Sequence, residues 1–436
     1  MGGGLAPDER RGLDLKGITI DSDAVARLAE KAITRVTIRD LWAAGYRPSS
    51  EQSLANAHFL HRELPIRFAH RVKQLQLLPF GLSDDPRIQE AAAVYSRLIM
   101  RIIRHPKPLT TDHEASFAEL IREATPPFYS VPHHIGAALL DLSTHADDDA
   151  QRELQQRALD EQLDHFFSAR IGQRFLFQHY IASREERRPT FSGIIQSDCS
   201  VVAVCEAAAS EAVAAINASH GVSPNVTIIG DRELTFTFVP SHIFFVVEEL
   251  TKNACKATAD FHVESKELPP VRVIVAKGDH EVTIKVADEG GGIARSKLRE
   301  KWSYRGSKLC SGRHTDGVVG LQRLGAAPPA SPGLGLPMSR LYAKYFGGTL
   351  HLAPMEGFGT DTYVKLNRLG DENCENPPAA VSNAPGGTAN RDEALKGEAG
   401  SASLFDAQAR RVEKIRVDEK KMPSQKEQGI ECRNVM

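Results

Sequence analysis

The segment EELTKNACKAT, from Glu248 to Thr258, constrains the fold of this chain more than any other segment. It belongs to a stretch from His242 to Thr258 that contains no proline or glycine and has apolar residues at helical spacing. The preceding Pro240-Ser241 pair is a helix start signal, with Ser241 as the expected cap. We therefore predict a helix over this stretch.

Four polar side chains fall on neighbouring strips of this predicted helix. Glu249 and Asn253 lie one turn apart, and Lys252 and Lys256 stack in the same way. A carboxylate, an amide oxygen and two ammonium groups suit Mg²⁺, because this ion takes oxygen ligands and shares substrate phosphates. A solvated helix with ordinary ion pairs would explain the helix, taken alone, equally well.

A strand and a glycine turn follow this helix. Apolar and polar residues alternate in EVTIKVAD, and Asp288 ends this strand on the parity of the apolar residues. An inward carboxylate needs a partner, and an adenine amino group would supply a donor. Gly290, Gly291 and Gly292 come next, where the backbone turns tightly or approaches a ligand. An ordinary glycine turn is the alternative for this motif alone.

A glycine loop precedes a second helical pattern. Gly333-Leu334-Gly335-Leu336-Pro337 stands before MSRLYAKYF, so proline falls in the first turn of the predicted helix. Free backbone N–H groups at such a helix start favour phosphate. The loop is a weak signal alone, whereas the order of the three elements is specific.

The ordered motifs resemble a known superfamily. The Glu-x-x-x-Asn helix, the Asp-x-Gly-x-Gly turn, the Gly-x-Gly loop and the late Gly359-Thr360 are similar to the N, G1 and G2 boxes and closing threonine of GHKL ATPases and kinases. HIFFVVEELTKNACKAT, PMSRLYAKYFGG and MEGFGTD look more closely like the mitochondrial pyruvate dehydrogenase kinases. HRELPIRFAHRVKQLQLLP and LDHFFSARIGQRFLFQHYI extend this resemblance into the amino-terminal half, so that it covers residues 40 to 368.

The resemblance implies roles for individual residues. Glu249 would be the general base that takes the proton of a serine hydroxyl, and Asn253 would hold Mg²⁺. Glu248 is the rival base, but helical phase with Asn253 favours Glu249. The residues that the resemblance assigns to ATP are Lys252, Asn253, Lys256, Asp288, Gly290, Gly292, Gly333, Leu334, Gly335, Leu336 and Thr360.

Composition excludes several other classes. The chain has 54 basic and 56 acidic residues, so we expect no strong field for nucleic acid or membrane. No apolar run approaches the roughly 20 residues of a membrane span. The six cysteines form no CxxC pair, which indicates reduced thiols and no structural zinc. MGGGLAPDERRG is not a clean transit peptide, so a mitochondrial matrix location follows from the resemblance alone.

The sequence predicts an α+β protein of two domains. Residues 20–186 form a helical bundle, with breaks at Pro79, at Pro106 and Pro108, and at Pro126-Pro127. Residues 190–368 form a GHKL-type ATP-binding α/β sandwich. The apolar stripes of the bundle are Leu64, Phe68, Val72 and Leu75; Val94, Leu98 and Ile102; Ile135, Leu139 and Leu142; and Leu159, Leu163, Phe167 and Ile171. The expected strands are 226–229, 234–239, 271–275, 282–286 and 361–366.

Two segments are too irregular for packed elements. Residues 303–332 hold five glycines and three prolines between the Asp288 turn and the Gly333 loop, which favours an ATP lid. Residues 369–436 are polar and charged, and we expect them to be disordered.

The chain also departs from the family pattern. Phe245 stands where the kinases usually carry a histidine four residues before the base, so no imidazole at this position orients or tunes Glu249. PPFYSVP lacks the family's Arg-His segment, and Ser331 replaces the first glycine of the second glycine box. The late Asp-Trp pair is absent, since Trp42 and Trp302 are the only tryptophans, so docking of the tail across subunits is not implied.

We expect an ATP-dependent serine kinase that inactivates the dehydrogenase component of the pyruvate dehydrogenase complex. The resemblance also implies a homodimer and docking of the lipoyl domain of the acyltransferase core, with an apolar surface near Leu41, Trp42 and Phe59 as the expected site. Burial in the bundle core is the alternative for each of these three residues. The alternatives are a branched-chain 2-oxo acid dehydrogenase kinase, a histidine kinase, an ATP-hydrolysing conformational machine like gyrase and MutL, and a nucleotide-binding regulator with weak catalysis. A histidine kinase is disfavoured because His113-Glu114, the closest match to a phosphoacceptor motif, lacks the following proline.

Overall fold

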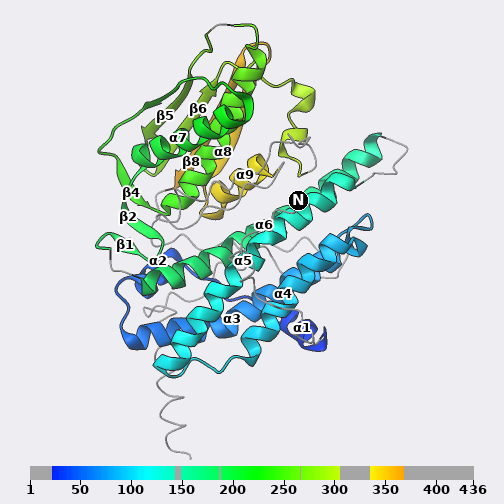
Figure 1. Cartoon of the computed structure of the whole chain (residues 1–436), viewed down its shortest axis with the longest axis vertical. Helices are drawn as coiled ribbons and strands as arrows, with labels where there is room; N and C mark the ends of the chain where they lie inside the picture. Colours follow the sequence, from blue (N-terminus) through cyan, green and yellow to red (C-terminus); the bar gives the residue numbers. More distant parts are fainter. Residues whose placement is uncertain (1–21, 143–148, 186–187, 266, 305–333, 368–436) are drawn as a thin grey trace, which may run out of the picture.

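The computed structural model describes residues 22–142, 149–185, 188–265, 267–304 and 334–367. A helical region occupies the lower part of Figure 1, and a mixed α/β domain lies above it. The predicted α+β class is therefore confirmed. The helices of the first region are α1 (Ser22–Ala29), α2 (Ile38–Gly45), α3 (Ser50–Gln76), α4 (Pro86–Arg104), α5 (Thr111–Asp141) and α6 (Asp149–Arg184), with a 3-10 turn, η2 (Leu82–Asp84), between α3 and α4.

Aromatic side chains fill the centre of the helical bundle. Phe68 of α3 lies between Tyr95 of α4 and Phe177 of α6, with ring centroids 5.5 and 5.7 Å away. Phe128 of α5 approaches Phe177 to 5.2 Å. The predicted stripes on α3, α4, α5 and α6 face this centre, because almost all their members are buried. Burial of these large rings contributes to the hydrophobic stabilisation that the four helices share.

The expected break at Pro126-Pro127 is wrong. Both prolines lie inside α5, which continues through Pro132 to Asp141. Each proline removes one backbone donor from the helix. The neighbouring Phe128 is fully buried against the bundle centre, so tertiary packing outweighs the local helix-breaking tendency.

A five-stranded mixed sheet organises the second domain. Its strands run in the order β3 (Val226–Ile229), β5 (Val271–Lys277), β6 (Glu281–Asp288), β8 (Gly359–Asn367) and β7 (Thr349–Met355). A smaller antiparallel sheet has the order β1 (Phe191–Ser192), β2 (Ile195–Ser200) and β4 (Thr235–Phe238). The helices of this domain are α7 (Val201–His220), α8 (Pro240–Phe261) and α9 (Gly335–Tyr345), and two 3-10 turns follow β6, η3 (Arg295–Lys297) and η4 (Glu300–Trp302).

The five expected strands are present, whereas β1, β2 and β7 were not predicted. The predicted helix over 242–258 is longer in the structure and begins at Pro240. Ser241 is not its cap, because Val239 occupies that position without a side-chain hydrogen bond. Ser241 is instead buried, and proline in the first turn starts the helix without a polar cap.

One described helix, α7, is long and apolar enough to cross a membrane, with a mean hydropathy of 1.5. Its sequence is rich in alanine, which is why no long run of large apolar residues marks it. It packs along α8 and beside β3. This finding qualifies the expectation drawn from the sequence, but it is weak evidence for a span because core helices pass the same test.

Helix α6 is the element that the two regions share. It runs along the boundary between them, with α9 beside it (Figure 1). Arg174 of α6 donates a hydrogen bond of 2.9 Å to the hydroxyl oxygen of Tyr342 on α9. Phe175 packs edge-on against Phe346, with ring centroids 5.6 Å apart. The bundle therefore supports the α/β domain directly through α9.

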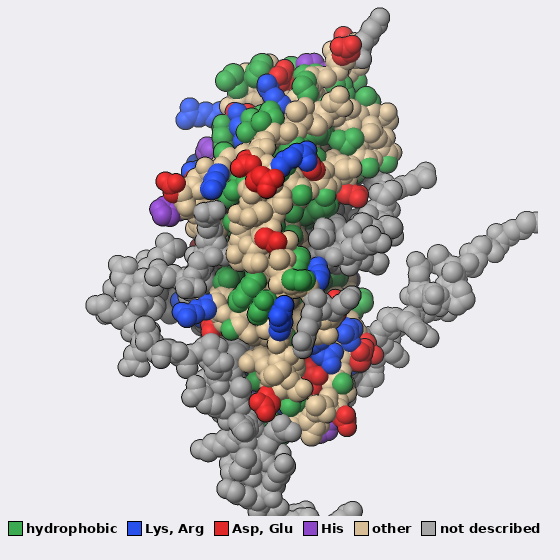
Figure 2. All heavy atoms as spheres, turned by 90° about the vertical axis from the view of Figure 1, so that its left-hand side faces the viewer, with side chains coloured by type: hydrophobic (Ala, Val, Ile, Leu, Met, Phe, Trp, Pro, Cys, Tyr) green, Lys and Arg blue, Asp and Glu red, His purple; other side chains and the backbone are tan. Residues whose placement is uncertain are grey.

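The described surface carries charges of both signs. In Figure 2, basic, acidic and apolar side chains are interspersed over the visible face. This distribution agrees with the near balance of charge in the sequence, because no single sign dominates that face.

Candidate active site

The predicted base lies on α8 in contact with a lysine. Glu249 is 9% exposed, and its Oε1 lies 2.5 Å from the ammonium nitrogen of Lys252. The same nitrogen lies 3.3 Å from Oε1 of Glu248. Burial lowers the pKa of Lys252, but the two carboxylates outweigh burial, so the net shift is upward. Lys252 is therefore held as a cation between two carboxylates.

The rival base has a different environment. Burial raises the pKa of Glu248, partly opposed by Lys252 and reinforced by the neighbouring charge of Glu249. The two glutamates differ in their position relative to α9. A Cβ atom at Gly335 would lie 2.1 Å from Oε2 of Glu249, so this carboxylate adjoins the start of α9.

The other two polar residues of the predicted set lie nearer the surface. Asn253 is exposed and one turn beyond Glu249 on α8. Lys256 forms an ion pair of 2.7 Å with Asp260. Helical phase thus brings Asn253 near Glu249 as predicted, whereas Lys256 has a surface partner of its own.

Asp288 ends β6 beside the glycine turn. Its Oδ1 accepts hydrogen bonds from the backbone N–H of Gly290 at 2.9 Å and of Thr360 at 3.2 Å. Burial raises the pKa of Asp288, although both hydrogen bonds favour the charged form. Both bonds go to one oxygen, so the second oxygen can accept from an adenine amino group.

The glycines of the turn allow close backbone packing. At Gly292, where φ is +71°, a Cβ atom would lie 2.2 Å from the carbonyl oxygen of Met355. At Gly290 a Cβ atom would lie 2.6 Å from the side chain of Ala257 on α8. The turn therefore needs glycine at both positions, and it brings Asp288, Thr360 and α8 around one space.

The start of α9 supplies backbone donors. Leu334 precedes the helix without a side-chain cap, and Gly335 and Leu336 form its first turn. First-turn N–H groups have no partner within a helix and face an anion favourably. Gly333 and residues 305–332 of the expected lid (303–332) lie outside the described residues, whereas its first two residues, Ser303 and Tyr304, are described and buried.

These groups fit ATP and Mg²⁺. The carboxylate of Asp288 can accept a hydrogen bond from the amino group of adenine, and the backbone N–H groups of Gly335 and Leu336 can donate to phosphate. The amide oxygen of Asn253 suits Mg²⁺, with phosphates and water completing the shell of the ion. The carboxylate of Glu249 stands where the two halves of such a site would meet.

Comparison with known proteins identifies the same two regions of the chain. A family model described as mitochondrial branched-chain alpha-ketoacid dehydrogenase kinase matches residues 35–196, and one described as histidine kinase-, DNA gyrase B- and HSP90-like ATPase matches residues 238–369. A mitochondrial [pyruvate dehydrogenase (acetyl-transferring)] kinase from Arabidopsis thaliana is 36% identical over 78% of this chain and 91% of its own length. The chain belongs to the pyruvate dehydrogenase kinase family.

Other members of this kinase family are also similar to this chain. The mitochondrial kinase of the same name from Schizosaccharomyces pombe is 31% identical over 80% of this chain and 96% of its own length. Isozyme 4 from Homo sapiens is 29% identical over 73% of this chain and 78% of its own length. The solved structure of full-length ShkA in complex with AMPPNP covers 61% of this chain and 47% of its own at 16% identity and a TM-score of 0.31, which carries no further argument.

The matched regions divide the kinase-family chain by function. The ATPase model covers every residue that the sequence assigned to ATP, and the α/β domain is accordingly an ATP-binding domain of the GHKL type. The kinase-specific model covers α2 to α6 and the first strands.

The departure at Phe245 has a structural counterpart. Phe245 is buried and packs against the ring of Tyr342, with centroids 4.9 Å apart. His242 is also a core residue, enclosed by Tyr342, Phe175 and Phe346. An aromatic cluster therefore lies one turn before Glu249, where the family usually has a histidine.

Sequence reasoning missed the contacts between α6 and α9. Arg340 and Tyr342 belong to the SRLYAKYF pattern, which we used to predict a helix and to support the family resemblance, but not to predict a contact. Their partners, Asp164 and Arg174, lie on α6 in a segment that we used for its apolar stripe and for its resemblance. A charged residue inside each apolar helical pattern was the available signal, but it did not specify the partner.

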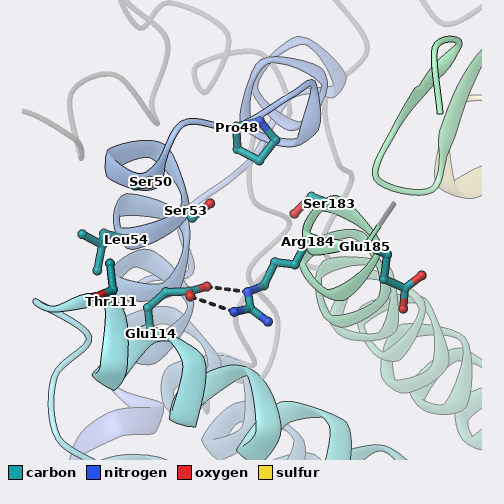
Figure 3. A pocket seen from close by; sticks show the side chains of 9 residues that line it. All are labelled: Pro48, Ser50, Ser53, Leu54, Thr111, Glu114, Ser183, Arg184 and Glu185. Carbon is teal, nitrogen blue, oxygen red and sulfur yellow. Dashed lines mark hydrogen bonds and ion pairs between the residues drawn. The ribbon is translucent and has the colours of Figure 1, made fainter. Parts of the chain in front are cut away.

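A separate cavity of about 290 Å³ lies at one end of the bundle (Figure 3). Glu114 of α5 accepts hydrogen bonds from Arg184 at 2.7 and 2.9 Å and from the Tyr180 hydroxyl at 2.7 Å. Its lining is Pro48, Ser50, Ser53, Leu54, Thr111, Glu114, Ser183, Arg184 and Glu185. No residue assigned to ATP lines this cavity, so it is not the nucleotide site.

Proposed function

We propose that this chain is an ATP-dependent serine kinase that phosphorylates, and so inactivates, the dehydrogenase component of the pyruvate dehydrogenase complex. The observation that carries the proposal is the contact between Glu249 and Gly335, which puts a carboxylate beside the predicted phosphate loop. The names of the relatives supply the substrate, since the three reported above are pyruvate dehydrogenase kinases.

Glu249 acts as the general base. It accepts the proton of the serine hydroxyl as the serine oxygen attacks the γ-phosphate of ATP, and the bond between that phosphorus and the oxygen bridging to the β-phosphate breaks. ADP leaves, and phosphoserine remains on the substrate. This transfer requires alignment and charge neutralisation more than covalent chemistry.

Lys252 orients Glu249. Its ammonium nitrogen lies 2.5 Å from Oε1 of Glu249, and this charged hydrogen bond fixes the position of the carboxylate. Because Glu248 holds the same ammonium from its other side, Lys252 has a fixed position from which it can also face phosphate oxygens.

Asn253 would hold Mg²⁺, and Asp288 would hold the adenine. When bound, Mg²⁺ neutralises the charge of the phosphates. Asn253 is exposed at the surface of α8 and free to turn its amide oxygen toward the metal. Asp288 and Thr360 orient the base, and the first-turn N–H groups of α9 orient the phosphates.

The pyruvate dehydrogenase complex is favoured over the branched-chain complex. RLYAKYF and MEGFGTD look more like the pyruvate dehydrogenase kinases. The kinase-specific family model bears the branched-chain name, which keeps that complex as the second candidate.

Lipoyl docking needs a revised surface. Leu41 and Phe59 are buried in the bundle core and cannot form the predicted groove. Trp42 is partly exposed and stacks on Tyr46, which is 38% exposed, with ring centroids 5.5 Å apart. We assign docking to this aromatic pair rather than to the cavity at Glu114, because the cavity lining is mainly polar. Tyr46→Ser should reduce stimulation by the lipoylated core and leave peptide phosphorylation unchanged.

The proposal includes a homodimer, which the family resemblance implies. It also includes a location in the mitochondrial matrix, which is in line with the mitochondrial names of the relatives. Light scattering of the purified chain gives its mass, and a monomer at working concentration would remove the dimer from the proposal. Fractionation of cells expressing the tagged full chain tests the compartment.

Incubation of purified dehydrogenase complex with γ-labelled ATP and the full chain tests the function. Label on a serine of the pyruvate dehydrogenase component supports the proposal, and label on the branched-chain enzyme alone supports the second candidate. Label on histidine, or release of inorganic phosphate without labelled protein, would overturn it. Nucleotide binding with neither product would indicate a regulator, the reading that Phe245 favours.

A further inference from the structure

Asp164 on α6 joins two parts of the α/β domain. Its two oxygens each accept a hydrogen bond of 2.9 Å from Nη2 of Arg340 on α9. Its Oδ1 also accepts a hydrogen bond of 2.7 Å from the hydroxyl of Tyr304, which follows η4. The single carboxylate of Asp164 therefore contacts both α9, through Arg340, and the segment after η4, through Tyr304.

The groups around this carboxylate limit its movement. The side chains of Asp164 and Arg340 are 27% and 19% exposed, so water reaches them only in part. The guanidinium of Arg340 lies over the ring of Trp302, 5.2 Å from its centroid. Tyr304 is buried and stacks on Phe167, with ring centroids 5.3 Å apart. The contact of Asp164 with Arg340 and Tyr304, called the clamp below, is thus both charged and packed against aromatic rings.

A second carboxylate on the same face of α6 supports the clamp. Asp160 lies one turn before Asp164 and accepts hydrogen bonds of 3.2 Å from the backbone N–H of Tyr304 and the hydroxyl of Ser303. Gln156 donates to the same oxygen of Asp160 at 3.0 Å. The contact between α6 and this segment is therefore continuous over two turns.

The clamp acts on the start of α9. Arg340 follows Gly335 by five residues on the same helix, and Leu334, just before it, is buried. A rigid helix transmits the position of Arg340 to its first turn, where the N–H groups assigned to phosphate lie. Gly335 in turn adjoins Glu249.

We propose that Asp164 is a positioning residue of the nucleotide site, which sets where the first turn of α9 meets the phosphates of ATP. The proposal rests on the proposed ATP-dependent function and names a bundle residue as part of that site. Asp164 contacts neither the substrate nor the reacting atoms, and it acts only through Arg340 and Tyr304. Adenine recognition at Asp288 is independent of it.

The test compares two ligands that differ only in phosphate. The full chain carrying Asp164→Asn should bind MgATP about tenfold more weakly, because a hydrogen bond between charged groups is replaced by a weaker one. Adenosine, measured by ligand-observed magnetic resonance, should bind within about twofold of wild type, since it makes no phosphate contact. General loss of structure would weaken both ligands alike.

Two further variants sharpen the comparison. Arg340→Gln should weaken MgATP to the same degree, and the double variant should bind no more weakly than either single one, because both remove one interaction. Glu206→Gln, which breaks the exposed Glu206–Arg232 pair of α7, is the matched control and should leave both affinities unchanged.

Equal weakening of adenosine and MgATP by Asp164→Asn, or additive losses in the double variant, would overturn the proposal. Unchanged MgATP affinity would do so as well. The comparison uses binding alone, so it judges Asp164 even if the chain transfers no phosphate, a result that would count against the proposed function instead.

Discussion

Gly335 and Glu249 occupy adjoining space: a Cβ atom at Gly335 would lie 2.1 Å from Oε2 and 3.1 Å from Cδ of Glu249. Gly335 is not among the glycines with positive φ, so its backbone conformation is open to other residues. Glycine is required there because the carboxylate of α8 and the first turn of α9 approach each other so closely. The contact joins the predicted base to the predicted phosphate loop.

Gly335→Ala should therefore lower phosphate transfer by about a hundredfold, since a catalytic group displaced by about 1 Å loses that much. The fold should persist, because the new methyl group meets the end of a side chain rather than backbone. Initial rates with γ-labelled ATP measure the effect. Gly136→Ala on α5 is the control, because its Cβ would lie 3.9 Å from Cδ1 of Leu334, an ordinary van der Waals distance that requires no movement of the loop before α9. Equal rates in the two variants would contradict the contact.

Glu249→Gln should lower transfer by roughly 10²–10⁴-fold while leaving ATP binding nearly intact, because a general base contributes about that factor. Glu248→Gln keeps Lys252 paired with Glu249 and should have a much smaller effect. Single-turnover rates separate chemistry from binding for both variants. A large loss in Glu248→Gln together with a small loss in Glu249→Gln would reverse the assignment.

Asp288→Ala should weaken ATP binding by about 1.5–3 kcal/mol, the contribution of a hydrogen bond to a charged acceptor. Calorimetry measures the affinity, and circular dichroism checks the fold. Glu281→Gln is the matched control, because Glu281 lies at the opposite end of β6 from Asp288 and pairs with Lys365 at 2.9 Å. Unchanged ATP affinity in folded Asp288→Ala would exclude a role in adenine binding.

The nucleotide motifs were predictable because their signals are local. Helical phase along α8 brought Glu249 and Asn253 onto one side, and alternation along β6 led to Asp288 at its end. By contrast, β7 contains Pro354 and several exposed residues, so its pattern was weak. Pro126 and Pro127 signalled a break that burial of Phe128 overrides.

The contacts that position the site were not predictable. Asp164 and Arg340 are separated by 176 residues, and neither spacing nor charge pattern specifies such a pair. Gly335 was expected to give backbone donors, whereas its contact with Glu249 depends on how α8 and α9 pack. Leu41 and Phe59 show the same limit, because an apolar residue on a helix can equally be surface or core.

Acid should destabilise the fold through His242. Burial, and then the nearby charge of Arg174, lowers the pKa of His242 to about 3 from its ordinary value of 6.5. Below the ordinary value the unfolded chain binds a proton that the folded chain excludes, so stability is fully present above pH 6.5 and is lost as pH falls toward 3. At about pH 5 this single group costs about 2 kcal/mol.

His242→Phe should remove that cost while keeping the aromatic contacts with Tyr342, Phe175 and Phe346. Urea unfolding at about pH 7.5 and about pH 5 should then show a smaller loss of unfolding free energy than in wild type, by about 2 kcal/mol. Burial also lowers the pKa of His179, to about 4, so part of the acid sensitivity should remain. His351→Gln, at an exposed position of β7, should leave the wild-type pH dependence unchanged. If His242→Phe and wild type lose equal stability between the two pH values, His242 does not carry the acid sensitivity, because its neutral form would then be no more favoured in the folded chain than in the unfolded one.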